Sequence, residues 1–160
     1  MTAEAVKKLL CLVPQPREGG WYVRTWESAE KFATRVGERR TSTAIYYLLE
    51  PGTFSEMHRL ASDEIFHHYL GGPVEMLQLF PDGSSARVVI GKDIEASERP
   101  QMVVERGVWQ GSRLLEGDFA LLGCTVSPGF EFEDYDAGSR EELTERWPAW
   151  RDLIAGLTRE

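Results

Sequence analysis

The stretch from Gly52 to Gly72, GTFSEMHRLASDEIFHHYLGG, decides the fold of this chain. It holds all three histidines of the sequence, with Glu64 between His58 and the pair at positions 67 and 68. Two strand-like runs lie within about one hairpin's length, and glycines bound the stretch. No other segment brings together as many potential metal ligands or proton carriers. Any chemistry that the protein performs is therefore expected here.

The segments around this stretch read as a series of short β-strands separated by turns. The turns carry Pro-Gly, Gly-Pro or Asp-Gly pairs, whose backbone preferences favour reversal of the chain. The strand-like segments, rich in aromatic, β-branched and other apolar residues, are TAIYYLLE (43–50), EIFHHYL (64–70), VEMLQLF (74–80), ARVVIG (86–91), QMVVE (101–105), GVWQGSRLLEGDFALLGCTV (107–126) and FEFEDYD (130–136). Short strands at this spacing predict an antiparallel sandwich or barrel.

The two ends of the chain change to a helical period. Apolar residues spaced for one helix face predict an N-terminal helix over 3–13, which Pro14 and Pro16 end. Ser139 begins a capping-box pattern, and apolar residues at helical spacing from Trp150 to Leu157 predict C-terminal helices that pack outside the barrel. The mixed-charge segment 27–42 is interpreted as a solvated surface loop, with a lid over a pocket as the alternative.

Composition limits the class of protein. With 160 residues and 42% hydrophobic content, the chain predicts a single domain over 1–160. Its 26 acidic against 18 basic residues give a net charge of -8, which argues against a nucleic-acid partner. No run approaches the roughly 20 apolar residues of a membrane helix, and the N-terminus lacks a secretory apolar core, so no membrane partner and a cytoplasmic location are expected. Cys11 and Cys124, without a paired spacing, are predicted to be buried thiols.

The spacing within residues 52–72 resembles the first motif of the cupin superfamily, G-x5-H-x-H-x3/4-E-x6-G, with Leu60 in place of its second histidine. Further segments are similar to one cupin branch, the Cupin_5 or DUF985 family of small jelly-roll proteins. They are LVPQPREGGWYVRTW, STAIYYLLEPGTFSEMHRLASDEIFHHYLGGPVEMLQLFPDG, VVERGVWQGSRL, ALLGCTVSPGFEFEDYD and LIAGLTRE. The resemblance implies a mainly β protein, a cupin-type antiparallel jelly-roll β-barrel (double-stranded β-helix) that forms a homodimer and holds a pocket inside the barrel.

The second cupin motif, G-x5-P-x-G-x2-H-x3-N, aligns with residues 99–114 and is degraded. Gln110 stands at its metal-binding histidine, and Glu105 and Leu114 replace its proline and asparagine. Of the four cupin ligands only His58 and Glu64 remain, and an amide is a poor ligand for the metals that imidazole and carboxylate bind. No cofactor is expected, and a weakly bound divalent metal at His58 and Glu64 is the alternative.

The retained histidine and glutamate suit acid and base work without a metal. Metal-free sugar epimerases of the cupin superfamily use a histidine base, and burial raises the pKa of a glutamate. The candidate catalytic residues are His67, Glu64 and His58. Strand alternation places His68 on the face of Glu64 and His67 on the other face unless a bulge intervenes, whereas the family pattern over 63–67 favours His67. Both histidines remain candidates at this point.

Several side chains are predicted to line the pocket or contact its ligand, although each has a structural alternative in the core or in a surface ion pair. They are Arg59, Tyr69, Trp109, Gln110, Phe130 and Phe132. The sequence thus predicts a barrel that binds a small molecule, as a metal-independent epimerase or isomerase of a sugar-like or carbonyl substrate. The alternatives are a non-catalytic ligand-binding protein and a metal-dependent cupin dioxygenase.

Overall fold

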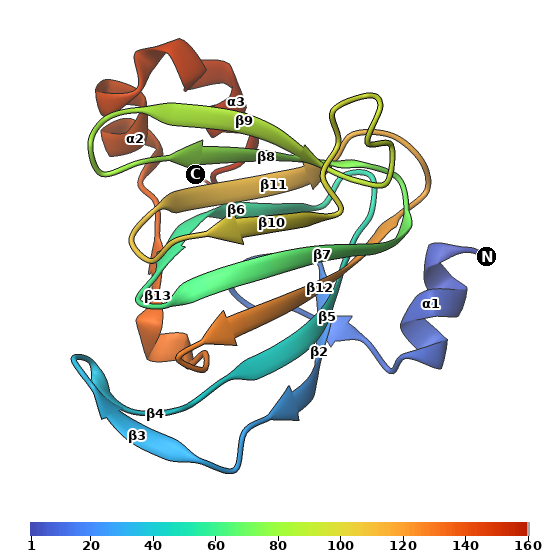
Figure 1. The fold of residues 1–160 in the computed structure, drawn as a ribbon. Coiled ribbons are helices and arrows are strands. Elements are labelled where there is room, and N and C mark those ends of the chain that lie inside the picture. Colours follow the sequence, from blue (N-terminus) through green and yellow to red (C-terminus); the bar gives the residue numbers. More distant parts are fainter. Residues whose placement is uncertain (160) are drawn as a thin grey trace.

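Two antiparallel sheets face each other across the core of the computed structural model, which describes residues 1–159 (Figure 1). In spatial order, the six-stranded sheet consists of β1 (Val13–Pro14), β2 (Trp21–Glu27), β5 (Thr43–Leu49), β12 (Ala120–Ser127), β7 (Asp63–Gly71) and β10 (Gln101–Val104). The five-stranded sheet consists of β13 (Tyr135–Ala137), β6 (Phe54–Leu60), β11 (Trp109–Leu114), β8 (Val74–Leu79) and β9 (Ser85–Ile90). Every pairing between named strands of residues 1–159 is antiparallel, which confirms the predicted jelly-roll barrel.

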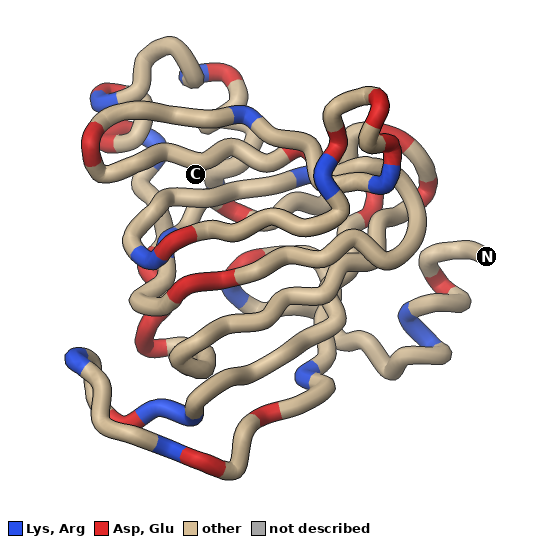
Figure 2. Tube along the Cα trace, in the orientation of Figure 1, with Lys and Arg blue, Asp and Glu red and all other residues tan. Residues whose placement is uncertain are grey.

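Alternation along the strands directs apolar side chains into the space between the sheets. Tyr47, Phe66 and Leu122 of the six-stranded sheet pack in one cluster with Met76 and Ile90 of the five-stranded sheet, and all five are at most 1% exposed. Figure 2 shows that charged residues are sparse along the central strands and gather in the connections and helices. Burial of this cluster is the main driving force that holds the sheets together.

Short helices cover the outer faces of the barrel. Helix α1 (Ala3–Leu9) packs Val6 on Leu48 and Leu121 of the six-stranded sheet. Helix α2 (Arg140–Arg146), the 3-10 helix η2 (Pro148–Trp150) and helix α3 (Arg151–Gly156) cover the five-stranded sheet at the upper left of Figure 1, as predicted. None of the helices within residues 1–159 has the length and apolar character needed to span a bilayer.

Three local predictions differ from the structure. The N-terminal helix is present but ends at Leu9 rather than at 13, because Val13 and Pro14 pair with β2. The predicted loop over 27–42 contains the hairpin of β3 (Lys31–Thr34) and β4 (Gly37–Arg40), which is mostly exposed and lacks the alternation of burial that would indicate strands. The predicted strand over 130–136 is broken by the 3-10 helix η1 (Phe132–Asp134), which leaves only β13 as a strand.

An ion pair fastens η1 to the β3–β4 hairpin. The Arg39 guanidinium donates two hydrogen bonds to the Asp134 carboxylate, at 2.7 and 2.8 Å, and both side chains are 5% exposed. Arg39 also donates to the backbone carbonyls of Val36 and Glu38. A planar guanidinium satisfies a carboxylate and two carbonyls at once, so this pair holds together two segments that share no sheet.

Replacement of Asp134 by Asn is expected to lower the free energy of unfolding by about 2 kcal/mol, because it removes the buried partner of a covered guanidinium and leaves only Glu133, which is 71% exposed, at 3.0 Å. Asp136→Asn is the matched control, since Asp136 pairs with Arg59 at the same 2.7 Å but both side chains are about half exposed. That variant should lose less than about 1 kcal/mol. Urea denaturation measures both, and equal losses in the two variants would contradict the structural role of the Arg39 pair.

Candidate functional site

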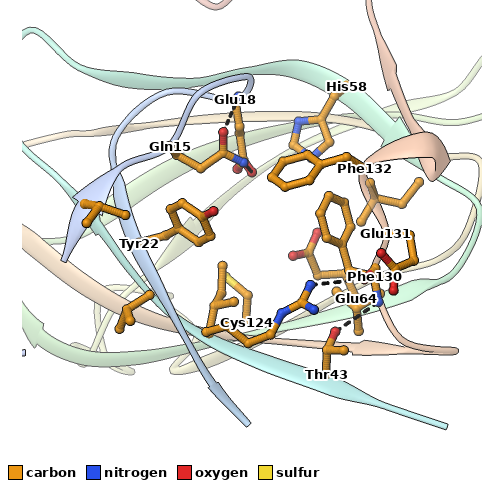
Figure 3. A pocket seen from close by; sticks show the side chains of 16 residues that line it. Gln15, Glu18, Tyr22, Thr43, His58, Glu64, Cys124, Phe130, Glu131 and Phe132 are labelled. Atoms are coloured by element: carbon orange, nitrogen blue, oxygen red, sulfur yellow. Dashed lines mark hydrogen bonds between the residues drawn. The ribbon is translucent and has the colours of Figure 1, made fainter. Parts of the chain in front are cut away.

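A cavity of about 520 Å³ opens within the barrel, toward the end where the segment 130–132 crosses between the sheets (Figure 3). This volume lies within the range of small-molecule sites. Its wall is largely apolar with a few polar groups, and the residues that line it are Val13, Gln15, Glu18, Tyr22, Val23, Arg24, Thr43, Ile45, His58, Leu60, Glu64, Cys124, Val126, Phe130, Glu131 and Phe132.

Glu64 enters the cavity from the inner face of β7. Its side chain is 6% exposed, and its Oε2 accepts a hydrogen bond of 2.7 Å from the Gln110 amide on β11 of the other sheet. Its second oxygen has no protein partner within residues 1–159. Burial, and then the nearby charge of Glu18, raise the pKa of Glu64 to about 8, against the lowering effect of Gln110. Glu64 therefore keeps its proton at neutral pH and is a hydrogen-bond donor inside the cavity.

His58 faces the cavity from β6 on the opposite sheet. It is 1% exposed, and its ring stacks on Tyr135 with 4.8 Å between ring centroids. Its Nδ1 lies 2.7 Å from the backbone carbonyl of Glu56, so this nitrogen carries the proton that the carbonyl accepts. In the neutral ring, Nε2 then holds a lone pair without a protein partner in the described chain. The imidazole is thus placed to accept a proton or a hydrogen bond.

Glu18, on the connection between β1 and β2, contributes a second carboxylate that the sequence analysis missed. The hydroxyl of Ser55 donates to one of its oxygens and the amide of Gln15 donates to the other at 3.4 Å. The Gln15 side-chain oxygen in turn accepts hydrogen bonds of 2.6 and 2.8 Å from the backbone N–H groups of Arg17 and Glu18. The adjacent Gly19-Gly20 pair was the only sequence signal, because it marks an irregular turn at this position.

Aromatic side chains close the cavity from the segment that follows β12. Phe130 and Phe132 meet edge to face, with ring centroids 5.2 Å apart, and both line the cavity as predicted. The Phe130 N–H donates to the Thr43 hydroxyl at 2.9 Å, and its carbonyl accepts from Arg24 at 3.1 Å. These backbone bonds hold the aromatic wall over the opening (Figure 3).

His67 and Tyr69 lie on the outer face of the six-stranded sheet, away from Glu64. The His67 ring stacks on Tyr69 at 6.3 Å, and its Nδ1 lies 3.5 Å from the Gln101 amide nitrogen. Tyr69 packs directly over Gly123, where a Cβ would collide with the phenol. The alternation of β7 therefore prevails over the family pattern that favoured His67. On the inner side, His68 contacts the Gly72 carbonyl at 2.9 Å.

Arg59 and Trp109 also lie outside the cavity, because both point outward from the five-stranded sheet. The Arg59 guanidinium lies over the Trp109 ring at 4.5 Å and pairs with Asp136. Trp109 packs with the cluster under the C-terminal helices. Gln110 is buried beside the site and acts through Glu64 rather than lining the cavity. Of the two cysteines, Cys124 is buried on the cavity wall as predicted, whereas Cys11 is exposed and corrects that prediction.

The donor set does not fit a cupin metal centre. Leu60 offers no donor, and Gln110 turns its amide nitrogen to Glu64, so His58 and Glu64 are the two remaining ligand types. Within residues 1–159 no three His, Cys, Asp or Glu side chains come together in a way that could hold a metal ion. Two protein ligands fall short of the three or four that zinc sites use.

Comparison with known proteins agrees with this architecture. The sequence model described as "Cupin superfamily (DUF985)" matches residues 4–138. The chain belongs to this family. An uncharacterized protein of Saccharomyces cerevisiae, YML079W, is 32% identical over an alignment of 134 residues, and the match covers 74% of this chain and 67% of the yeast protein.

Two solved structures share the DUF985 chain's whole architecture. A hypothetical protein from Leishmania major has 32% identity, a TM-score of 0.93 and full coverage of both chains. Protein SO0799 from Shewanella oneidensis has 33% identity and a TM-score of 0.91, covering 99% of this chain and 98% of its own. Oxalate decarboxylase of Bacillus subtilis, at 15% identity and a TM-score of 0.55, shares the fold over 91% of this chain and 37% of the enzyme.

Glu64→Gln is expected to stabilise the protein at alkaline pH. The pKa of Glu64 is about 8 in the folded state against an ordinary value of 4.5, so the folded state holds the extra proton between these values. The wild-type protein therefore loses stability as pH rises from about 4.5 to about 8. The variant removes this loss and should gain about 2–4 kcal/mol at pH 9, with no such gain below pH 4.5.

Urea denaturation at a series of pH values measures this effect. Glu145→Gln, on the exposed face of α2, is the control for the loss of one carboxylate. A gain for Glu64→Gln that is the same at pH 4 and pH 9 would contradict the assignment of a raised pKa to Glu64.

Proposed function

We propose that this cupin binds a small molecule inside the barrel and isomerises or epimerises a sugar-like or carbonyl substrate by metal-independent proton transfer. His58 acts as the base and Glu64 as the acid. One observation supports the proposal. His58 of β6 and Glu64 of β7 are both buried and line the same cavity, where His58 offers the lone pair of its Nε2 and Glu64 keeps its proton. Pairs of titratable groups held in opposite protonation states are typical of acid-base sites.

The proposed reaction needs only these two groups. The His58 Nε2 removes the proton from the carbon next to the carbonyl, while the Glu64 carboxyl group gives its proton to the carbonyl oxygen, which forms an enediol. In isomerisation, the protonated His58 returns its proton to the neighbouring carbon while the Glu64 carboxylate takes the proton of the other enediol hydroxyl, which becomes the new carbonyl. In epimerisation, the enediol turns its opposite face to His58, which returns the proton to the same carbon while Glu64 takes back the proton from the original carbonyl oxygen. The apolar wall excludes water and thereby strengthens both interactions.

Exchange of carbon-bound hydrogen in heavy water tests this reaction on a panel of unmodified aldoses and ketoses, followed by proton NMR. His58→Gln and Glu64→Gln should each lower the exchange rate by at least about 100-fold. The wild-type rate should fall above about pH 8, where Glu64 loses its proton. His67→Gln is the matched control, since His67 lies on the outer face of the same sheet.

Loss of exchange in His67→Gln with retention in His58→Gln would contradict the assigned base. The alternative function is non-catalytic ligand binding, which the enclosed aromatic wall also favours. A ligand that binds in the cavity while no member of the panel exchanges would support that alternative.

We further propose that the partner is a second copy of this chain. The proposal is supported by apolar side chains that stay exposed on the outer face of the six-stranded sheet, namely Trp26, Tyr69, Leu70 and Val103, each 45–54% exposed. Large apolar side chains that stay exposed on one sheet face are typical of an oligomer interface. Light scattering at micromolar concentration should give twice the chain mass of 18.1 kDa, and the monomer mass would contradict the proposal.

A further inference from the structure

The ionised groups of the cavity wall are mainly acidic. The carboxylates of Glu18 and Glu131 line it beside the protonated Glu64, against the single guanidinium of Arg24. The Arg24 guanidinium is already engaged, by Glu27 at 3.2 Å and by the Phe130 carbonyl at 3.1 Å. Phosphate and carboxylate groups are bound in proteins by free guanidinium or ammonium groups or by clusters of N–H donors. Arg24 is the one Lys or Arg among the residues that line this cavity, and the carboxylate of Glu27 already offsets its charge.

The negative charge of Glu18 is built into the site. Ser55 and Gln15 each donate to its carboxylate, and Gln15 is itself fixed by two backbone N–H groups. These donors hold the Glu18 side chain in one position on the cavity wall. The Glu18 charge also reaches Glu64, where it is the second largest cause of the raised pKa. An anion placed between these groups would meet the same repulsion.

The size of the cavity does not discriminate between neutral and anionic ligands. A cavity of about 520 Å³ accommodates molecules of drug size, which includes a sugar with or without a phosphate. The polar groups on its wall include the Glu64 carboxyl group, the His58 Nε2 and the Tyr22 hydroxyl, which suit hydroxyl and carbonyl groups. Discrimination between neutral and anionic forms of one molecule therefore depends on charge.

We infer that the cavity selects uncharged polyhydroxy carbonyl compounds and excludes phosphorylated, carboxylated and nucleotide-linked ones, with Glu18 as the specificity-determining residue. The inference rests on the proposed function for the reaction, but the charge selectivity is a property of the cavity alone. It is therefore measurable even if the protein has no enzymatic activity.

A pair of fluorescent probes that share one ring frame tests the charge selectivity directly. N-phenyl-1-naphthylamine is neutral, and 1-anilinonaphthalene-8-sulfonate carries one negative charge. Glu18→Gln should strengthen binding of the sulfonate about fivefold, the order expected for one unit charge at several ångströms in a partly solvated site, and leave the neutral probe within about twofold.

Two further variants complete the test. Glu131→Gln, at the exposed rim of the cavity, should also strengthen sulfonate binding and carries little risk to the fold. Glu145→Gln makes the same change in net charge outside the cavity and should alter neither probe. An unchanged sulfonate affinity in both Glu18→Gln and Glu131→Gln, or an equal gain in Glu145→Gln, would overturn the inference.

The exchange assay tests the preference for uncharged substrates by comparing a sugar with its phosphate ester. Fructose should exchange at least about tenfold faster than fructose 6-phosphate, because the phosphate meets uncompensated carboxylates. Faster exchange of the phosphate ester would overturn the inference and leave the proposed proton transfer standing. Absence of exchange with every sugar would instead remove the proposed function, and the probe titration would still decide the charge selectivity.

Discussion

The hydrogen bond from Gln110 to Glu64 joins the two sheets inside the barrel, and the rest of the site depends on it. A carboxyl group on the inner face of β7 loses its hydration when the sheets close, and such a group is costly unless it is hydrogen-bonded or neutral. Here it is both, because Gln110 satisfies one oxygen and the raised pKa keeps a proton on the group. The loss of hydration therefore leaves Glu64 as a protonated polar group in an otherwise apolar interior.

Gln110 stands where the cupin motif has a histidine, and it changes the set of polar groups inside the barrel. In the cupin motif this position carries a metal-binding histidine, whereas here its amide is directed at Glu64. The charge that a metal would neutralise is removed by protonation instead. His58 keeps its place opposite, fixed by the Glu56 carbonyl and the Tyr135 ring, so its second nitrogen faces the cavity. The arrangement places a protonated carboxyl group and an imidazole nitrogen on the wall of one cavity.

The walls of the cavity come from segments that have little regular structure of their own. The segment 130–134 crosses the opening because Thr43 and Arg24 hold its backbone and Arg39 holds Asp134. The connection that carries Glu18 is held by Ser55 and by the bond from the Tyr47 hydroxyl to the Gly19 carbonyl. Functional loops on a rigid β scaffold are a common arrangement. In this protein, side-chain contacts between residues far apart in the sequence fix the position of these loops.

The sequence by itself predicted an antiparallel sandwich or barrel and the helices at both ends, because turn residues and periodicity are local signals. The resemblance to cupins added the jelly-roll and the inward position of Glu64. It also identified His58, Phe130 and Phe132. The tertiary structure placed His58 on the cavity wall and His67 on the outer face of β7, since the alternation of a strand defines an inside and an outside only once the two sheets pack. It alone revealed Glu18 and Arg39, whose roles arise from contacts with residues 37 and 95 positions away that no periodicity encodes.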